Sequence, residues 1–134
     1  MDQTKPMTIL IVEDQNLISL QLKYILQNWA RSASISILIA TNGQDGLLQA
    51  RQARPDLIIT DLAMPKMDGF DMVKALRQEQ SGSLIPIIGI SASDPADVKT
   101  SAFRDLCDDV LDNPFSPQDV LDKVSALLWA KMML

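Results

Sequence analysis

Three acidic side chains in this sequence stand where short apolar runs end, and their chemistry is the most informative. Glu13 and Asp14 follow the run 8–12, and Asp61 follows the run 56–60. If these runs are neighbouring strands, the three carboxylates converge and each raises the free energy needed to ionise the others. A divalent cation relieves such repulsion, and Mg²⁺ accepts carboxylate ligands while keeping water molecules for a phosphate. The pattern predicts a magnesium site beside a carboxylate that could attack phosphorus.

Polar residues also follow two later apolar runs. Ser91 comes directly after the run 84–90, and its hydroxyl could donate a hydrogen bond to a phosphoryl oxygen. Asn113 and Pro114 end a weaker run, 109–112. Ligands of open parallel sheets bind beyond the carboxyl ends of the strands, where the strand order reverses. We therefore assign these positions to the same candidate site.

The composition excludes several other classes of site. The chain has no histidine and one cysteine, Cys107, so His-dependent catalysis, His-ligated zinc and an internal disulfide are excluded. Its net charge of −5 argues against direct binding of nucleic acid. The apolar runs are shorter than the roughly 20 residues that span a bilayer, and no secretory signal opens the chain. We expect a cytoplasmic protein without membrane contact.

The elements that position these residues alternate along the chain. Amphipathic stretches with helical periodicity follow each apolar run, and one of them has Val98, Ala102 and Leu106 as its apolar face after a start at Asp94 and Pro95. The interval between runs suits one strand, one crossover helix and two loops. Five such units predict an α/β fold, a doubly wound five-stranded parallel sheet. We see no linker, so we expect one domain over residues 1–134 and no effector domain.

Taken together, these segments resemble the receiver domain of response regulators in two-component signalling. The most specific match is Asp61, three residues, Pro65, and then Met67-Asp68-Gly69. The resemblance covers nearly the whole chain and implies a flavodoxin-like (βα)5 fold with strand order 2-1-3-4-5. The matching segments are 9–14, 55–70, 87–92 and 113–115.

The resemblance also implies a phosphorelay function. Asp61 would accept a phosphoryl group from a phosphohistidine on a sensor histidine kinase or a histidine phosphotransfer protein. Mg²⁺ would be held by Glu13, Asp14, Asp61 and the backbone carbonyl of Ala63. The chain would not be an enzyme beyond its own phosphorylation and dephosphorylation. Its output would pass through a partner protein, a fused effector or a homodimer.

Three further positions receive roles from the same resemblance. Ser91 would be the hydroxyl that moves to the phosphoryl group, and Ala92 would be the small residue beside it. Pro114 would follow a cis peptide bond.

The chain departs from the family at two positions. Receiver domains carry a lysine before Pro-Phe, and here that residue is Asn113, which brings no charge to a phosphoryl group. The aromatic residue that often moves with the switch hydroxyl is replaced by Val110. These changes predict an atypical output, and Lys66, in the loop after Asp61, is the candidate cation to substitute for the missing lysine.

Other functions fit less well. A pseudo-receiver, which docks proteins without phosphorylation, is favoured by Asn113 and Val110. It is opposed by the intact acidic residues Glu13, Asp14 and Asp61. A phosphatase with an aspartate nucleophile needs an acid two residues after Asp61, where the chain has Ala63. A flavin-binding protein needs a small, uncharged phosphate loop in place of Glu13 and Asp14.

Overall fold

The structure is a computed structural model that describes residues 7–29, 35–80, 82, 84–91 and 97–132. Strands and helices alternate throughout, as the hydrophobic pattern predicts. The strands are β1 (Met7–Val12), β2 (Ile35–Ala40), β3 (Leu57–Asp61), β4 (Ile87–Ser91) and β5 (Asp109–Asp112). The helices are α1 (Asn16–Trp29), α2 (Gly43–Ala53), α3 (Gly69–Gln78), α4 (Val98–Leu106) and α5 (Pro117–Met132).

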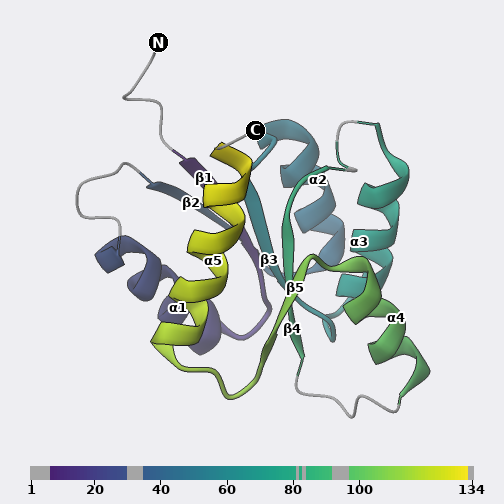
Figure 1. The fold of residues 1–134 in the computed structure, drawn as a ribbon. Helices are drawn as coiled ribbons and strands as arrows, with labels where there is room; N and C mark the ends of the chain where they lie inside the picture. Colours follow the sequence, from purple (N-terminus) through teal and green to yellow (C-terminus); the bar gives the residue numbers. More distant parts are fainter. Residues whose placement is uncertain (1–6, 30–34, 81, 83, 92–96, 133–134) are drawn as a thin grey trace.

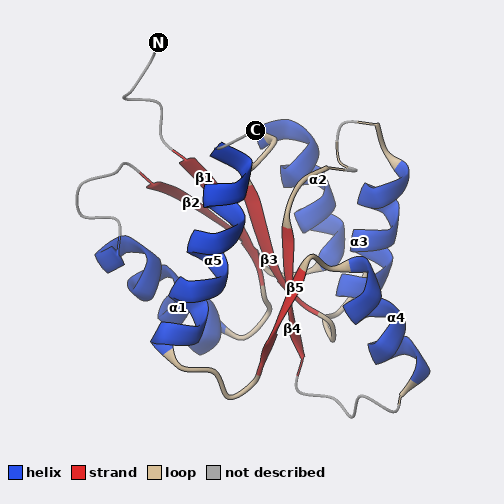
Figure 2. Ribbon diagram, viewed as in Figure 1, coloured by secondary structure: helices blue, strands red, loops and turns tan. Residues whose placement is uncertain are grey.

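The five strands form one parallel sheet in the order β2-β1-β3-β4-β5. This order confirms the predicted doubly wound architecture. Helices α1 and α5 cover one face of the sheet, and α2, α3 and α4 cover the other (Figures 1 and 2). The strand order reverses between β1 and β3, so the ends of these two strands form the crevice in which such folds bind ligands.

Strand β1 shows why its sequence is continuously apolar. Ile9 and Ile11 belong to the core beneath α1 and α5, whereas Leu10 and Val12 belong to the core beneath α2, α3 and α4. All four side chains are fully buried. A strand with both faces covered has no solvent side, so alternation with polar residues is absent. The two cores hold β1 rigidly up to Val12, immediately before the acidic pair.

Strand β4 begins later than the apolar run 84–90 predicts. The strand starts at Ile87, because Pro86 has no amide to donate to a neighbouring strand, and the Leu84 side chain is 90% exposed. The Pro86 carbonyl still accepts a hydrogen bond from the Ile58 amide at 3.0 Å. The strand extends to Ser91, one residue beyond the predicted end.

Helix α4 differs most from its prediction. Its N-cap is Asp97, whose side chain accepts a hydrogen bond from the Thr100 amide, and the predicted cap, Asp94, lies outside the described residues with Pro95. The predicted apolar face was wrong at Val98, which is 83% exposed, whereas Leu106 does pack against the core. The buried residues of the helix are Thr100 and Phe103.

The reason for the different face lies on β4. A methyl group at Gly89 would lie 2.7 Å from the Phe103 ring, so the missing side chain makes room for this ring. Phe103 is the largest apolar side chain of α4, so burying it against Gly89 removes more apolar surface from water than burying Val98 would. The helix is therefore turned so that Phe103 faces the sheet.

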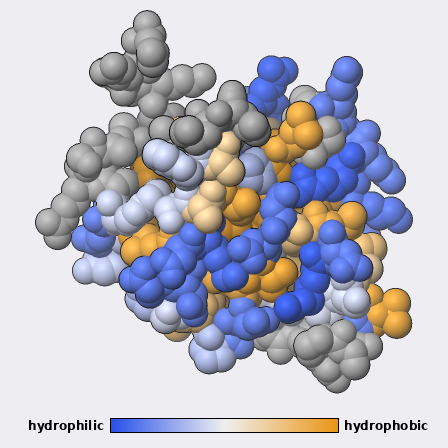
Figure 3. Space-filling view, viewed as in Figure 1, coloured by the Kyte–Doolittle hydropathy of each residue, from blue (hydrophilic) through white to orange (hydrophobic). Residues whose placement is uncertain are grey.

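The outer surface is mixed in character. On the face shown in Figure 3, hydrophilic side chains cover most of the surface and hydrophobic ones lie between them. None of the described helices has both the length and the apolar character needed to cross a bilayer.

Candidate functional site

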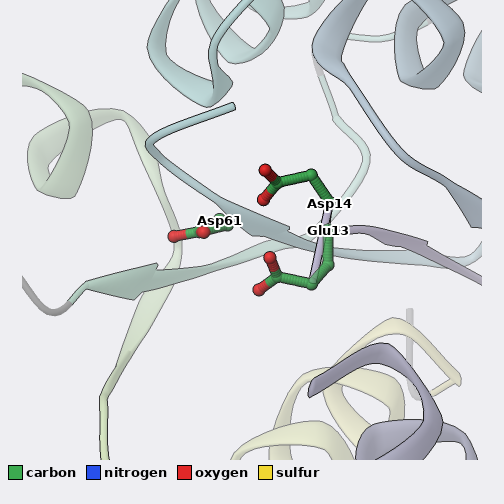
Figure 4. Close-up of side chains that lie close together, drawn as sticks. All are labelled: Glu13, Asp14 and Asp61. Carbon is green, nitrogen blue, oxygen red and sulfur yellow. The ribbon is translucent and has the colours of Figure 1, made fainter. Parts of the chain in front are cut away.

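The acidic residues predicted from the sequence lie together at the carboxyl edge of the sheet. Val12 of β1 pairs with Thr60 of β3, so the residues that follow, Glu13 and Asp61, leave neighbouring strands at the same level. Glu13, Asp14 and Asp61 each place a carboxylate oxygen within 4.8 Å of the others. Their carboxylates point to the same side of the strand ends (Figure 4). The predicted convergence of the three acids is confirmed.

Glu13 is the most deeply placed of the three acids. Its side chain is fully buried, and its Oε2 accepts a hydrogen bond from the Gln15 amide at 3.1 Å. Its Oε1 is also buried and has no hydrogen-bond partner in the described part of the chain. Burial, and then the charge of Asp61, raise the pKa of Glu13 from 4.5 to about 8.

Asp61 is half-buried, and, as for Glu13, burial disfavours its ionised form. Burial raises the pKa of Asp61, and the hydrogen bond that the Leu62 amide donates to its Oδ1 at 2.8 Å opposes this shift. Asp14, by contrast, is exposed to solvent. No described Lys or Arg forms an ion pair with these acids, so a cation from outside the chain would stabilise the ionised forms of Glu13 and Asp61.

The three acids fit a divalent cation. One oxygen of Glu13 has no hydrogen-bond partner among the described residues, and the pKa values of Glu13 and Asp61 are raised. Both features are expected of an acidic site that binds a cation. The ligand set consists of carboxylate oxygens, the chemistry that Mg²⁺ prefers. Ala63, the predicted carbonyl ligand, is exposed two residues after Asp61.

Ser91 lies beside the acids, at the end of β4. Ile90 pairs with Asp61 across β3 and β4, so Ser91 is the next residue along that edge. The side chain is 4% exposed, and its Oγ has no hydrogen-bond partner among the described residues. A buried, unpartnered hydroxyl is costly unless another group uses it, so Ser91 is available to a ligand. Ala92, predicted next to it, falls outside the described residues.

Asn113 and Pro114 follow β5 on the far side of Ser91. The Asn113 amide donates a hydrogen bond to the Ser91 carbonyl at 3.0 Å, while the Asn113 side chain is exposed. The peptide bond between Asn113 and Pro114 is cis, as the family resemblance implies. Val110, half-buried on β5, has no ring that could move with the Ser91 hydroxyl.

Lys66, the cation predicted as a substitute for the missing lysine, lies in the loop after Asp61. It forms no ion pair with any described carboxylate, and it lines a hollow of about 550 Å³ together with Leu48 and Arg51 of α2. Its backbone is left-handed, with a φ of 65°, which is uncommon outside glycine.

Sequence reasoning missed the contacts that shape the loop after Asp61. The Gly43 amide at the start of α2 donates to the Met67 carbonyl, and the Gly69 amide donates to the Leu62 carbonyl, both at 2.7 Å. The Lys99 side chain of α4 forms an ion pair with Asp68. The Asn42-Gly43 pair was recognisable as a turn, but nothing local indicates that this turn contacts a loop from another unit.

Comparison with known proteins identifies the family. Residues 9–125 match the model of the response regulator receiver domain. The chain belongs to this family. Its relatives include the alkaline phosphatase synthesis transcriptional regulatory protein PhoP of Bacillus subtilis, which is 33% identical over 120 residues, 90% of this chain and 48% of PhoP. The chain spans about half the length of PhoP and of several other curated relatives that it matches.

Solved receiver structures share the fold. The chemotaxis response regulator CheY4 of Vibrio cholerae is 27% identical, with a TM-score of 0.79 over 92% of this chain and 99% of CheY4. The receiver domain of the sensor histidine kinase PA1611 of Pseudomonas aeruginosa is 20% identical, with a TM-score of 0.82 over 92% of this chain and 98% of that one. That structure has a magnesium ion coordinated in its active-site cleft. Receiver domains are phosphoacceptor modules of signal transduction, and this chain has their acidic cluster.

Proposed function

We propose that Asp61 is the phosphoacceptor of this receiver domain and that a phosphohistidine on a partner protein is the donor. In the reaction, an oxygen of the Asp61 carboxylate attacks phosphorus and a P–O bond forms. The P–N bond of the phosphohistidine breaks, and its electron pair remains on the imidazole, which leaves. The observation that carries the proposal is the convergence of Asp61 with Glu13 and Asp14 at the edge of the sheet.

Glu13, Asp14, Asp61 and the Ala63 carbonyl would hold the Mg²⁺ that the site requires. When bound, the ion supplies positive charge that offsets the charge of the transferring phosphoryl oxygens. Glu13 contributes a buried, fixed ligand, and Asp14 reaches the site from the solvent side. The Leu62 amide donates to Oδ1 of Asp61 and so fixes the orientation of the carboxylate that would react.

Ser91 would donate its unpartnered hydroxyl to the phosphoryl group. The Asn113 side chain can offer a neutral hydrogen bond where the family has an ammonium group, and charge-assisted bonds are about twice as strong. The residue that follows β5 therefore binds the phosphoryl group more weakly than the lysine of the family would. Ala92 and Pro114 complete the set of residues assigned by the resemblance.

The partners follow from this reaction. The donor is a sensor histidine kinase or a histidine phosphotransfer protein, which supplies the histidine that the chain lacks. The output passes through a partner protein, a fused effector or a homodimer, and the chain acts in the cytoplasm without contacting nucleic acid or a membrane. Residues 1–134 form one domain, with no effector domain among them.

The test is the intact mass of the protein after incubation with acetyl phosphate. One phosphoryl group should be added in the presence of Mg²⁺, and none after chelation with EDTA or in Asp61→Asn. Asp71→Asn, which changes an exposed aspartate on α3, is the matched control and should be phosphorylated like the wild type. Addition to Asp61→Asn would show that another residue is the acceptor.

The alternative, a pseudo-receiver that docks proteins without phosphorylation, is favoured by the exposed, uncharged Asn113. It predicts no phosphoryl addition from acetyl phosphate or from any phosphohistidine donor. It also predicts that Asp61→Asn leaves partner binding unchanged, whereas a phosphoswitch requires binding to respond to phosphorylation of Asp61.

A further inference from the structure

The start of helix α2 is in direct contact with the loop that follows Asp61. The Gly43 amide donates a hydrogen bond to the Met67 carbonyl at 2.7 Å. A methyl group at Gly43 would lie 2.4 Å from that carbonyl oxygen and 2.8 Å from the carbonyl oxygen of Asp68. Both atoms belong to the backbone, so no side-chain rotation can relieve the overlap. Only glycine permits this approach.

The same loop is closed at its other end. The Gly69 amide donates to the Leu62 carbonyl at 2.7 Å, and a methyl group at Gly69 would lie 2.0 Å from the Asp61 carbonyl oxygen. The loop is therefore folded back on the residue that it follows, and its Met67 carbonyl is held by Gly43. Displacing Met67 and Asp68 would move the whole turn that contains Ala63.

Helix geometry explains why Gly43 can make this bond. Gly43 is the first residue of α2, and the first amides of a helix have no intrahelical acceptor. The cap residue, Asn42, satisfies the Asp45 amide, at 2.8 Å. The Gly43 amide remains available, and the Met67 carbonyl accepts it at the positive end of the helix dipole.

We propose that Gly43 is a positioning residue for the phosphoacceptor loop, which it holds at the distance that lets Ala63 and Asp61 act on one Mg²⁺ ion. This inference rests on the proposed function of the site. Any side chain at position 43 would push the loop away by roughly 1 Å to restore ordinary contact distances. Mg²⁺ demands nearly ideal octahedral geometry, so a displacement of this size weakens its binding. Residues that support metal ligands typically change metal affinity by about 10- to 100-fold when replaced.

The test compares Gly43→Ala with Gly46→Ala. Gly46 lies on the same helix, but a methyl group there would meet the Met72 Sδ at 2.7 Å and the methyl groups of Val12 at 3.0 Å, which are side-chain atoms. Gly46→Ala should lower stability without moving the loop. Gly43→Ala should weaken Mg²⁺ binding about tenfold or more by calorimetric titration. It should also shift the backbone NMR signals of residues 62–68 in EDTA, in the absence of metal.

A second measurement uses the wild-type chain, in case Gly43→Ala does not fold. The hydrogen-exchange rate of the Gly43 amide measures how often the loop opens, because the acceptor of this amide is the Met67 carbonyl in the loop. Mg²⁺ at ten times its Kd should slow this exchange about tenfold if binding requires the closed loop. The Gly46 amide, which bonds to the Asn42 carbonyl within α2, serves as the internal control and should change less.

The outcomes separate this inference from the proposed function. If wild-type protein neither binds Mg²⁺ nor accepts a phosphoryl group, the proposed function fails. If the wild type does both, and Gly43→Ala folds with unchanged Mg²⁺ affinity and unchanged loop signals, the role of Gly43 is wrong. A Gly43 amide that exchanges as fast as an unprotected one in the wild type would overturn it as well.

Discussion

At the scale of single residues, the proton on Glu13 connects the acidic site to the stability of the chain. The folded state raises the pKa of this carboxyl from 4.5 to about 8, because the group is buried and faces Asp61. Above pH 4.5 the unfolded chain loses the proton while the folded chain keeps it, so the folded state binds more protons. In the absence of metal, the free energy of unfolding therefore falls as the pH rises from 4.5 to about 8.

Replacing Glu13 with glutamine should remove most of this pH dependence. Glutamine cannot ionise, so Glu13→Gln should be more stable than the wild type near the upper end of the window, by on the order of a few kcal/mol. The measurement is urea unfolding in EDTA across that pH range. Asp105→Asn, at an exposed site on α4, should keep the wild-type slope. An equal slope in Glu13→Gln would mean that other groups, such as Asp61, carry the dependence.

Cys107 should be chemically inert in the folded chain. Burial raises the pKa of its thiol to about 12, and a methyl group at Gly89 would lie 2.8 Å from its sulfur. Because the thiolate is the nucleophile, alkylation by iodoacetamide at neutral pH should be far slower in native protein than in urea. Rapid alkylation of the native protein would show that the end of α4 opens readily.

At the scale of elements, Arg77 of α3 binds the segment before β4 and the segment between α4 and β5. Its guanidinium donates to the Leu106 carbonyl at 3.1 Å, to the Ile85 carbonyl at 2.8 Å and to Asp108 at 2.8 Å. Asp108 also accepts a hydrogen bond from the Ile87 amide, at 2.7 Å. One planar group thus fixes the entry to β4 and the turn into β5, which a lysine cannot do with a single ammonium.

Arg77→Ala should destabilise the chain by about 2–3 kcal/mol, because it leaves the part-buried carbonyls of Ile85 and Leu106 without this donor. Arg77→Lys should recover only part of this loss. Arg51→Ala is the control, since the Arg51–Glu79 pair has an arginine side chain that is 52% exposed, and exposed pairs contribute about 0–1 kcal/mol. Urea unfolding measures all three variants, and equal losses in Arg77→Ala and Arg51→Ala would contradict the argument.

The sequence predicted an element well where its residues are continuously apolar. Strand β1 is apolar on both faces, so its burial follows from the run itself. Helix α4 was predicted poorly, because its buried face depends on Gly89, a residue of another element. The periodicity of a helix depends on its own residues alone, so it contains no information about the space that Gly89 leaves for Phe103.

At the scale of the whole molecule, topology brings the site together. Glu13 and Asp61 are far apart in the sequence, yet the order β2-β1-β3 makes their strands neighbours. Their convergence was predictable because strand ends can be located from apolar runs. The contact between Gly43 and the loop was not predictable, since it depends on the distance between α2 and the loop that follows β3.

The whole molecule should also gain stability from Mg²⁺. A ligand that binds only the folded state at 100 times its Kd adds about 2.7 kcal/mol to the free energy of unfolding. For a domain of this size, the midpoint of thermal unfolding should rise by roughly 10 °C. The ion binds ionised carboxylates, and Glu13 keeps its proton up to a pH of about 8, so the gain should increase as the pH rises towards that value.

This link between Mg²⁺ binding and pH can be tested by melting curves measured by circular dichroism. The curves are recorded at the lower and upper ends of the pH window of Glu13, with Mg²⁺ or with sodium chloride of equal ionic strength. The Mg²⁺-dependent rise should be larger at the higher pH and should oppose the loss of stability measured in EDTA. It should be much reduced in Asp14→Asn, which removes one of the three clustered carboxylates. An equal rise in sodium chloride would point to general screening of the −5 net charge, and an undiminished rise in Asp14→Asn would place the cation elsewhere.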